Sequence, residues 1–108
     1  MQRKRWGLLM PKDTSLETER KAARAVVEGR VQGVGFRYWT VQLACEFNIT
    51  GWVRNCPDYS VEIFAEGEPS ALDEFLSAVQ HSHPSAYISD FTVHAARCEG
   101  FRSFQVRY

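Results

Sequence analysis

Alternation of apolar and polar residues predicts five β-strands in this chain. The two longest alternating stretches are residues 22–31 and 87–97. Shorter ones lie at residues 50–54, 61–65 and 104–108. Strands with this alternation bury one face and expose the other, so the pattern predicts a sheet that packs against another layer.

Apolar residues at helical spacing interrupt the strands in two places. The first set predicts a helix over residues 36–48 and consists of Phe36, Trp39, Leu43, Ala44 and Phe47. The second set predicts a helix that opens at Gly67-Glu68-Pro69-Ser70 and consists of Leu72, Phe75, Leu76 and Val79. Ser70 with Asp73 resembles a capping pair for this helix. We expect Trp39 and Trp52 in the core and Cys45 in it or half-buried.

The element order is β-α-β-β-α-β followed by a short terminal strand. This order is typical of the ferredoxin-like, split βαβ sandwich of the α+β class, in which an antiparallel sheet carries both helices on one face. The 108 residues, of which 44% are hydrophobic, suffice for one such domain. We expect it to cover residues 22–108, after a flexible N-terminal extension at residues 1–21.

The connection between the first strand and the first helix has the composition of an anion-binding loop. Glycines allow a tight turn whose N–H groups point into one concavity, and a helix N-terminus adds unpaired donors and a positive dipole end. An arginine at the helix start offers parallel donors to phosphate oxygens. The residues expected to hold a small oxyanion are Gln32, Gly33, Val34, Gly35, Phe36 and Arg37.

Two segments resemble the signatures of the acylphosphatase family. One is the strand–loop–helix segment from Val27 to Arg37, which fits throughout, and the other is Gly51-Trp52-Val53-Arg54-Asn55. The resemblance covers roughly residues 22–108, including the ending Phe104-Gln105-Val106-Arg107-Tyr108. The fold that the resemblance implies is of the split βαβ kind, in agreement with the periodicity.

The resemblance implies an enzyme that hydrolyses acyl phosphates to a carboxylate and inorganic phosphate without a metal or cofactor. It also implies that Arg37 is the catalytic, substrate-binding arginine and that Asn55 positions the attacking water. The side-chain amide of asparagine can both donate and accept hydrogen bonds, which suits it to orient a water molecule. Positioning and electrostatic stabilisation do most of the work in phosphoryl transfer, so no side chain is expected to act as general base.

One position departs from the family pattern. Tyr59 follows Pro57-Asp58 where the family usually has glycine. If this turn requires a positive φ, tyrosine costs roughly 1 kcal/mol relative to glycine. A turn of another type would avoid the strain but would shift Asn55, which precedes it in the chain.

Charge and cysteine content narrow the expected partners. The net charge is zero, but residues 22–108 hold seven Lys/Arg against ten Asp/Glu, and an acidic body disfavours broad nucleic-acid binding. Three cysteines without CxxC spacing, Cys45, Cys56 and Cys98, favour reduced thiols in the cytoplasm over disulfides or a zinc site. We expect a cytoplasmic monomer that acts on a small acyl phosphate, with neither a nucleic-acid nor a membrane partner.

Other interpretations remain open on the sequence. The main one is a non-catalytic, regulatory anion-binding domain on the same scaffold, similar to domains of larger maturation proteins that handle carbamoyl phosphate. An RNA-binding ferredoxin-like module is opposed by Glu62 and Glu66 on a strand. A metal site at His81 and His83 is less expected than contacts with solvent or with the helix dipole.

Overall fold

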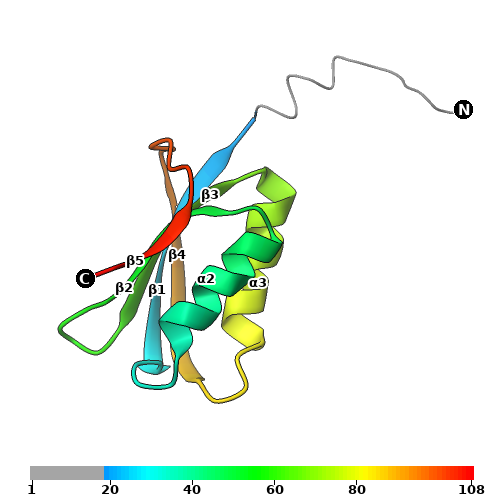
Figure 1. Cartoon of the computed structure of the whole chain (residues 1–108). Helices are drawn as coiled ribbons and strands as arrows, with labels where there is room; N and C mark the ends of the chain where they lie inside the picture. Colours follow the sequence, from blue (N-terminus) through cyan, green and yellow to red (C-terminus); the bar gives the residue numbers. More distant parts are fainter. Residues whose placement is uncertain (1–18) are drawn as a thin grey trace, which may run out of the picture.

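The computed structural model describes residues 19–108. Within them, one five-stranded sheet is covered on one face by two helices (Figure 1). The strands are β1 (Lys21–Arg30), β2 (Thr50–Asn55), β3 (Val61–Gly67), β4 (Tyr87–Ala96) and β5 (Phe104–Arg107), and the helices are α2 (Phe36–Glu46) and α3 (Pro69–His81). The predicted element order is confirmed. The expected N-terminal extension lies, except for residues 19–21, outside the described residues.

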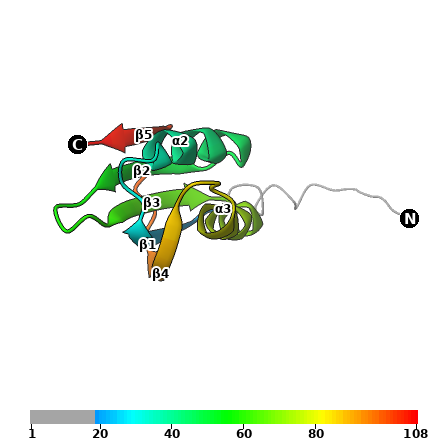
Figure 2. The ribbon, with the colours of Figure 1, turned by 90° about the horizontal axis from the view of Figure 1, so that it is seen from below.

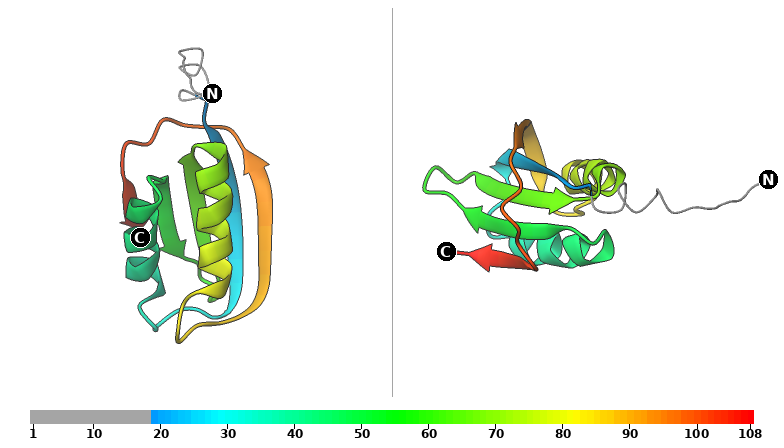
Figure 3. Two further views of the ribbon diagram at one scale, coloured as in Figure 1. Left: turned by 90° about the vertical axis from the view of Figure 1, so that its right-hand side faces the viewer. Right: turned by 90° about the horizontal axis from the view of Figure 1, so that it is seen from above.

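The sheet and the helices form two layers, and Figures 2 and 3 show both helices on the same face. Alternate residues of the strands face the helices and make the main core with Phe75 of α3, among them Ala25, Val27, Val53 and Ile63. The α+β sandwich predicted from the periodicity is therefore confirmed.

The sheet is mixed rather than purely antiparallel, which corrects one part of the predicted fold. Its strand order is β4-β1-β3-β2-β5, and every neighbouring pair is antiparallel except β2 and β5. Residues 97–103 cross from one edge of the sheet to the other at a single end of the strands (Figure 3), so β5 has to run opposite to β4. Since β2 also runs opposite to β4, β5 and β2 are parallel.

A buried carboxylate fixes this crossing connection. Glu66 of β3 is fully buried, and its carboxylate accepts hydrogen bonds from the backbone N–H groups of Glu99, Gly100 and Phe101. The Phe101 ring packs edge-on against Phe64, with ring centroids 5.6 Å apart. A buried acid needs such donors, and here they come from the connection itself.

The predicted cap of α3 is wrong. The cap of α3 is Glu68, whose carboxylate accepts from the Ala71 N–H at 3.0 Å and from the Ser70 hydroxyl at 2.7 Å. Because Pro69 is the first helical residue, Ser70 already lies inside the helix and does not cap it with Asp73.

The predicted burial of Cys45 is also wrong. Cys45 is exposed, since it stands one position, or about 100° of helical rotation, past the buried Ala44. Trp52 is buried as predicted, but with Phe64 on the face away from the helices, and Trp39 is half-buried.

The exposed face of the sheet carries an ion-pair network that makes stability depend on pH. Glu62 pairs with Arg24 and with Arg54. Burial by itself raises the pKa of Glu62, but the hydrogen bonds and charges of the two arginines outweigh it and hold that pKa below its usual value. A carboxyl of this kind stabilises the fold above its unfolded-state pKa of about 4.3, and the stabilisation is lost as the pH falls through the folded-state pKa.

We therefore expect the free energy of unfolding to fall as the pH drops below about 4.3, and Glu62→Gln to reduce that dependence. Urea denaturation at a series of pH values measures it for both proteins. If the substituted protein loses stability with acid as steeply as the wild type, Glu62 is not the responsible group.

Candidate active site

The two signature segments meet at one end of the sheet. β1 and β2 both end there, and α2 begins there (Figure 1). Between them lies a cavity of about 170 Å³. A water takes about 30 Å³ in the liquid, so the cavity has room for a small oxyanion and a water. Its lining consists of Val31, Gly33, Gly35, Phe36, Arg37, Tyr38 and Asn55.

The loop before α2 has the conformation expected of an anion cradle. Gly33 has φ +80° and Gly35 φ +76°, and a Cβ at either position would meet no atom within 4 Å. Glycine is therefore required by the left-handed backbone rather than by lack of space. Gly35 is also the N-cap of α2, and the first turn has neither a side-chain cap nor an acidic residue. The positive end of the helix is thus open to an anion.

Gln32 and Val34 shape the loop but do not line the cavity. The Gln32 amide Nε2 donates to the carbonyl oxygens of Cys56 at 3.0 Å and Ser60 at 2.9 Å. These bonds tie the loop to the β2–β3 turn, and Val34 packs against the core. The part that their backbone N–H groups play toward an anion stays a prediction.

Arg37 carries the positive charge of the cavity. Within residues 19–108 both ion pairs involve Glu62, so the Arg37 guanidinium has no carboxylate partner there. Its Cζ lies 5.4 Å from the centroid of the Tyr108 ring, a cation–π contact that restricts where the guanidinium lies. Local sequence patterns do not place Tyr108 at the site, because only the pairing of β5 with β2 brings it there.

Asn55, the last residue of β2, presents an unsatisfied polar atom. Its Oδ1 is buried and has no hydrogen-bond partner among the described residues. Most buried side-chain oxygens do have a partner, and this one belongs to a residue that lines the cavity. Asn55 is therefore suited to bind a water beside the anion.

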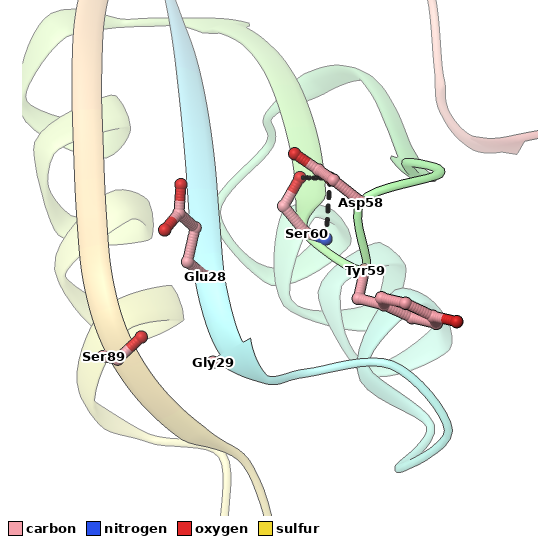
Figure 4. A pocket seen from close by; sticks show the side chains of 6 residues that line it. All are labelled: Glu28, Gly29, Asp58, Tyr59, Ser60 and Ser89. Atoms are coloured by element: carbon pink, nitrogen blue, oxygen red, sulfur yellow. Dashed lines mark hydrogen bonds between the residues drawn. The ribbon is translucent and has the colours of Figure 1, made fainter.

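The turn after Asn55 holds Tyr59 at φ +73°, in the left-handed region that disfavours tyrosine. The Asp58 carboxylate accepts from the N–H and the hydroxyl of Ser60, which lowers the pKa of Asp58 (Figure 4). The Cys56 N–H donates to the Ser60 carbonyl at 2.8 Å. The turn thus keeps the strained conformation rather than another type.

A second hollow lies beside this turn and is lined in part by Glu28 and Asp58 (Figure 4). The negative charges of these two carboxylates make it unsuited to bind phosphate.

Tyr59→Gly is expected to raise the free energy of unfolding by about 1 kcal/mol, because the strain disappears and the exposed ring contributes little packing. Urea denaturation measures the change. Tyr59→Ala is the matched control, since it removes the ring but keeps the strain. Equal stabilisation by both substitutions would show that backbone strain is not the cause.

The histidines and cysteines are dispersed. His81 Nδ1 lies 3.0 Å from the Ser77 carbonyl oxygen, and His83 packs against α2. In the part of the chain that the structure describes, no three His, Cys, Asp or Glu residues are arranged to hold a metal ion, and neither helix is long and apolar enough to span a membrane. Cys56, which follows Asn55 in the chain, is half-buried.

Known proteins are similar to this chain in both sequence and fold. Residues 23–106 match the family model Acylphosphatase. An acylphosphatase of Treponema denticola is 46% identical over 86 residues, which are 80% of this chain and 92% of that protein. The crystal structure of acylphosphatase from Bacillus subtilis matches with a TM-score of 0.78 and 42% identity over 82% of this chain and 99% of its own.

A longer protein contains a similar unit. Full-length HypF, whose crystal structure was determined in a phosphate- and nucleotide-bound form, matches with a TM-score of 0.79 and 26% identity. The match covers 83% of this chain but 12% of that one. Because the family model and relatives of similar length match most of the described domain, the chain belongs to the acylphosphatase family.

Proposed function

We propose that this member of the acylphosphatase family hydrolyses an acyl phosphate to a carboxylate and inorganic phosphate, with Arg37 holding the phosphoryl group and Asn55 positioning the attacking water. One observation carries the proposal. Two residues line the same small cavity at the N-terminus of α2: Arg37, whose guanidinium has no carboxylate partner within residues 19–108, and Asn55, whose buried Oδ1 has no hydrogen-bond partner there.

The division of roles follows from the chemistry of the groups. Charge spreads over the phosphoryl oxygens during transfer, and fixed donors stabilise it there. The backbone N–H groups of the loop and of the first turn of α2 can donate hydrogen bonds to the phosphoryl oxygens in addition to those from the Arg37 guanidinium. Asn55 Oδ1 can accept a hydrogen bond from the water and so orient it for in-line attack.

Among residues 19–108, no Asp, Glu or His lines the cavity. We therefore assign the proton of the water to the bound phosphate or to solvent, rather than to a side chain. A pH–rate profile with a sharp ionisation of an enzyme group would contradict this assignment.

Hydrolysis of benzoyl phosphate, followed by absorbance in the presence of EDTA, tests the proposal. Wild-type turnover without metal is expected, together with its loss in Arg37→Ala and Asn55→Ala proteins that remain folded. A folded, inactive wild type that still binds phosphate would favour a regulatory anion-binding domain. That alternative is less favoured because relatives of similar length match this chain over 92% and 99% of their length, whereas HypF does so over 12%.

We further infer a monomer that works in the cytoplasm. One domain brings Arg37 and Asn55 to the same cavity, and Cys45, Cys56 and Cys98 do not pair with one another in disulfides. Sedimentation velocity measures the oligomeric state, and localisation of a tagged protein tests the compartment.

A further inference from the structure

His83, in the connection between α3 and β4, contacts two aromatic side chains of α2. Its ring centroid lies 4.9 Å from that of Trp39, in an edge-to-face arrangement of 75°, and 5.5 Å from that of Phe36. The Phe36 and Trp39 rings are 5.6 Å apart. The three rings form one cluster, at separations where such pairs attract each other.

Backbone hydrogen bonds orient the His83 ring. Its Nδ1 accepts from the N–H groups of Ser85 at 3.0 Å and of Ala86 at 3.1 Å. Both bonds require an unprotonated Nδ1, so the neutral imidazole carries its proton on Nε2. The hydrogen bonds within the α3–β4 connection therefore fix the orientation of the His83 ring, while the ring itself contacts the aromatic side chains of α2.

Phe36 links this cluster to the phosphate site. It is the first residue of α2, lies between Gly35 and Arg37, and is 2% exposed. It also lines the cavity. Because no side chain within residues 19–108 caps the first turn of α2, packing of Phe36 constrains that turn, and a shift of Phe36 would move Arg37 and the neighbouring N–H groups.

We propose that His83 is a positioning residue of the phosphate site: through Phe36 and Trp39 it places Arg37 and the first turn of α2 for phosphate binding. The inference rests on the function proposed above. Asn55 is held by β2 and the turn that follows it, not by these rings. Loss of the His83 ring therefore weakens binding more than it slows the chemical step.

Three substitutions test the inference. His83→Asn keeps an acceptor for the two N–H groups but removes the ring, and His83→Phe keeps a ring but removes the acceptor. His81→Asn is the matched control, since His81 is exposed and bonded to Ser77. The measurements are KM and kcat for benzoyl phosphate, the inhibition constant of inorganic phosphate, and the thermal unfolding midpoint.

For His83→Asn we expect KM and the phosphate inhibition constant to rise together by about fivefold to tenfold, as the loss of one or two aromatic contacts implies. We expect kcat to change by less than about threefold. His83→Phe should bind phosphate more tightly than His83→Asn although its connection is less stable, and His81→Asn should match the wild type.

Unchanged KM and inhibition constant in His83→Asn would overturn the inference, whether or not the melting temperature falls. A loss of kcat at constant KM would also overturn it. Failure of the proposed function is distinguishable, because it would appear in the wild type as absent turnover before any variant is compared.

Discussion

Arg37→Ala is expected to lower kcat/KM for acyl phosphate hydrolysis by about 10²- to 10³-fold, the range found when a fixed donor to transition-state charge is removed. Arg37 is the cation that lines the cavity, and its guanidinium has no carboxylate partner within residues 19–108. Steady-state kinetics with benzoyl phosphate measure the loss. Since the guanidinium makes a cation–π contact with Tyr108, which is itself exposed, the melting temperature should change little.

Arg37→Lys and Arg54→Ala complete this experiment. Lysine keeps the charge but not the planar fork of donors, so it should recover only part of the activity. Arg54 precedes Asn55 on β2 but pairs with Glu62 on the other face of the sheet, so its loss should affect stability more than catalysis. Equal activity in the Arg37→Ala and wild-type proteins would exclude the assigned role.

Asn55→Ala is expected to lower kcat by about 10²-fold while KM changes by only a few-fold, because the water matters most in the transition state. The measurement is again steady-state kinetics. The same substitution should leave the free energy of unfolding unchanged or raise it, since it removes a buried oxygen that has no partner among the described residues.

Asn55→Asp provides the second variant. It preserves the shape of the side chain but places a negative charge beside the phosphate, so KM should rise as well as kcat fall. If Asn55→Ala keeps wild-type kcat, the water is oriented by another group. If Asn55→Ala instead unfolds the protein, the side chain is structural and the assignment is wrong.

The strands and helices were predictable because their signals are local. Alternation along β1 and β3 and helical spacing along α2 and α3 reflect which residues face one core, and that core is the one observed. Capping was harder to predict. Ser70 belongs to the preferred N-cap residue types and Glu68 does not, but α3 begins at Pro69, so the cap position falls on Glu68.

The sequence by itself determined the sandwich fold and the loop that carries Arg37, because each depends on periodicity or on a contiguous motif, whereas the role of Asn55 stays a prediction that the family resemblance implies. Only the tertiary structure decided what surrounds these groups. The parallel β5 brings Tyr108 to Arg37. Gln32 ties the loop to the turn that follows β2. His83, in the connection after the C-terminus of α3, contacts Phe36. These contacts join residues distant in the chain, and they arise from strand order and packing, which no local pattern encodes.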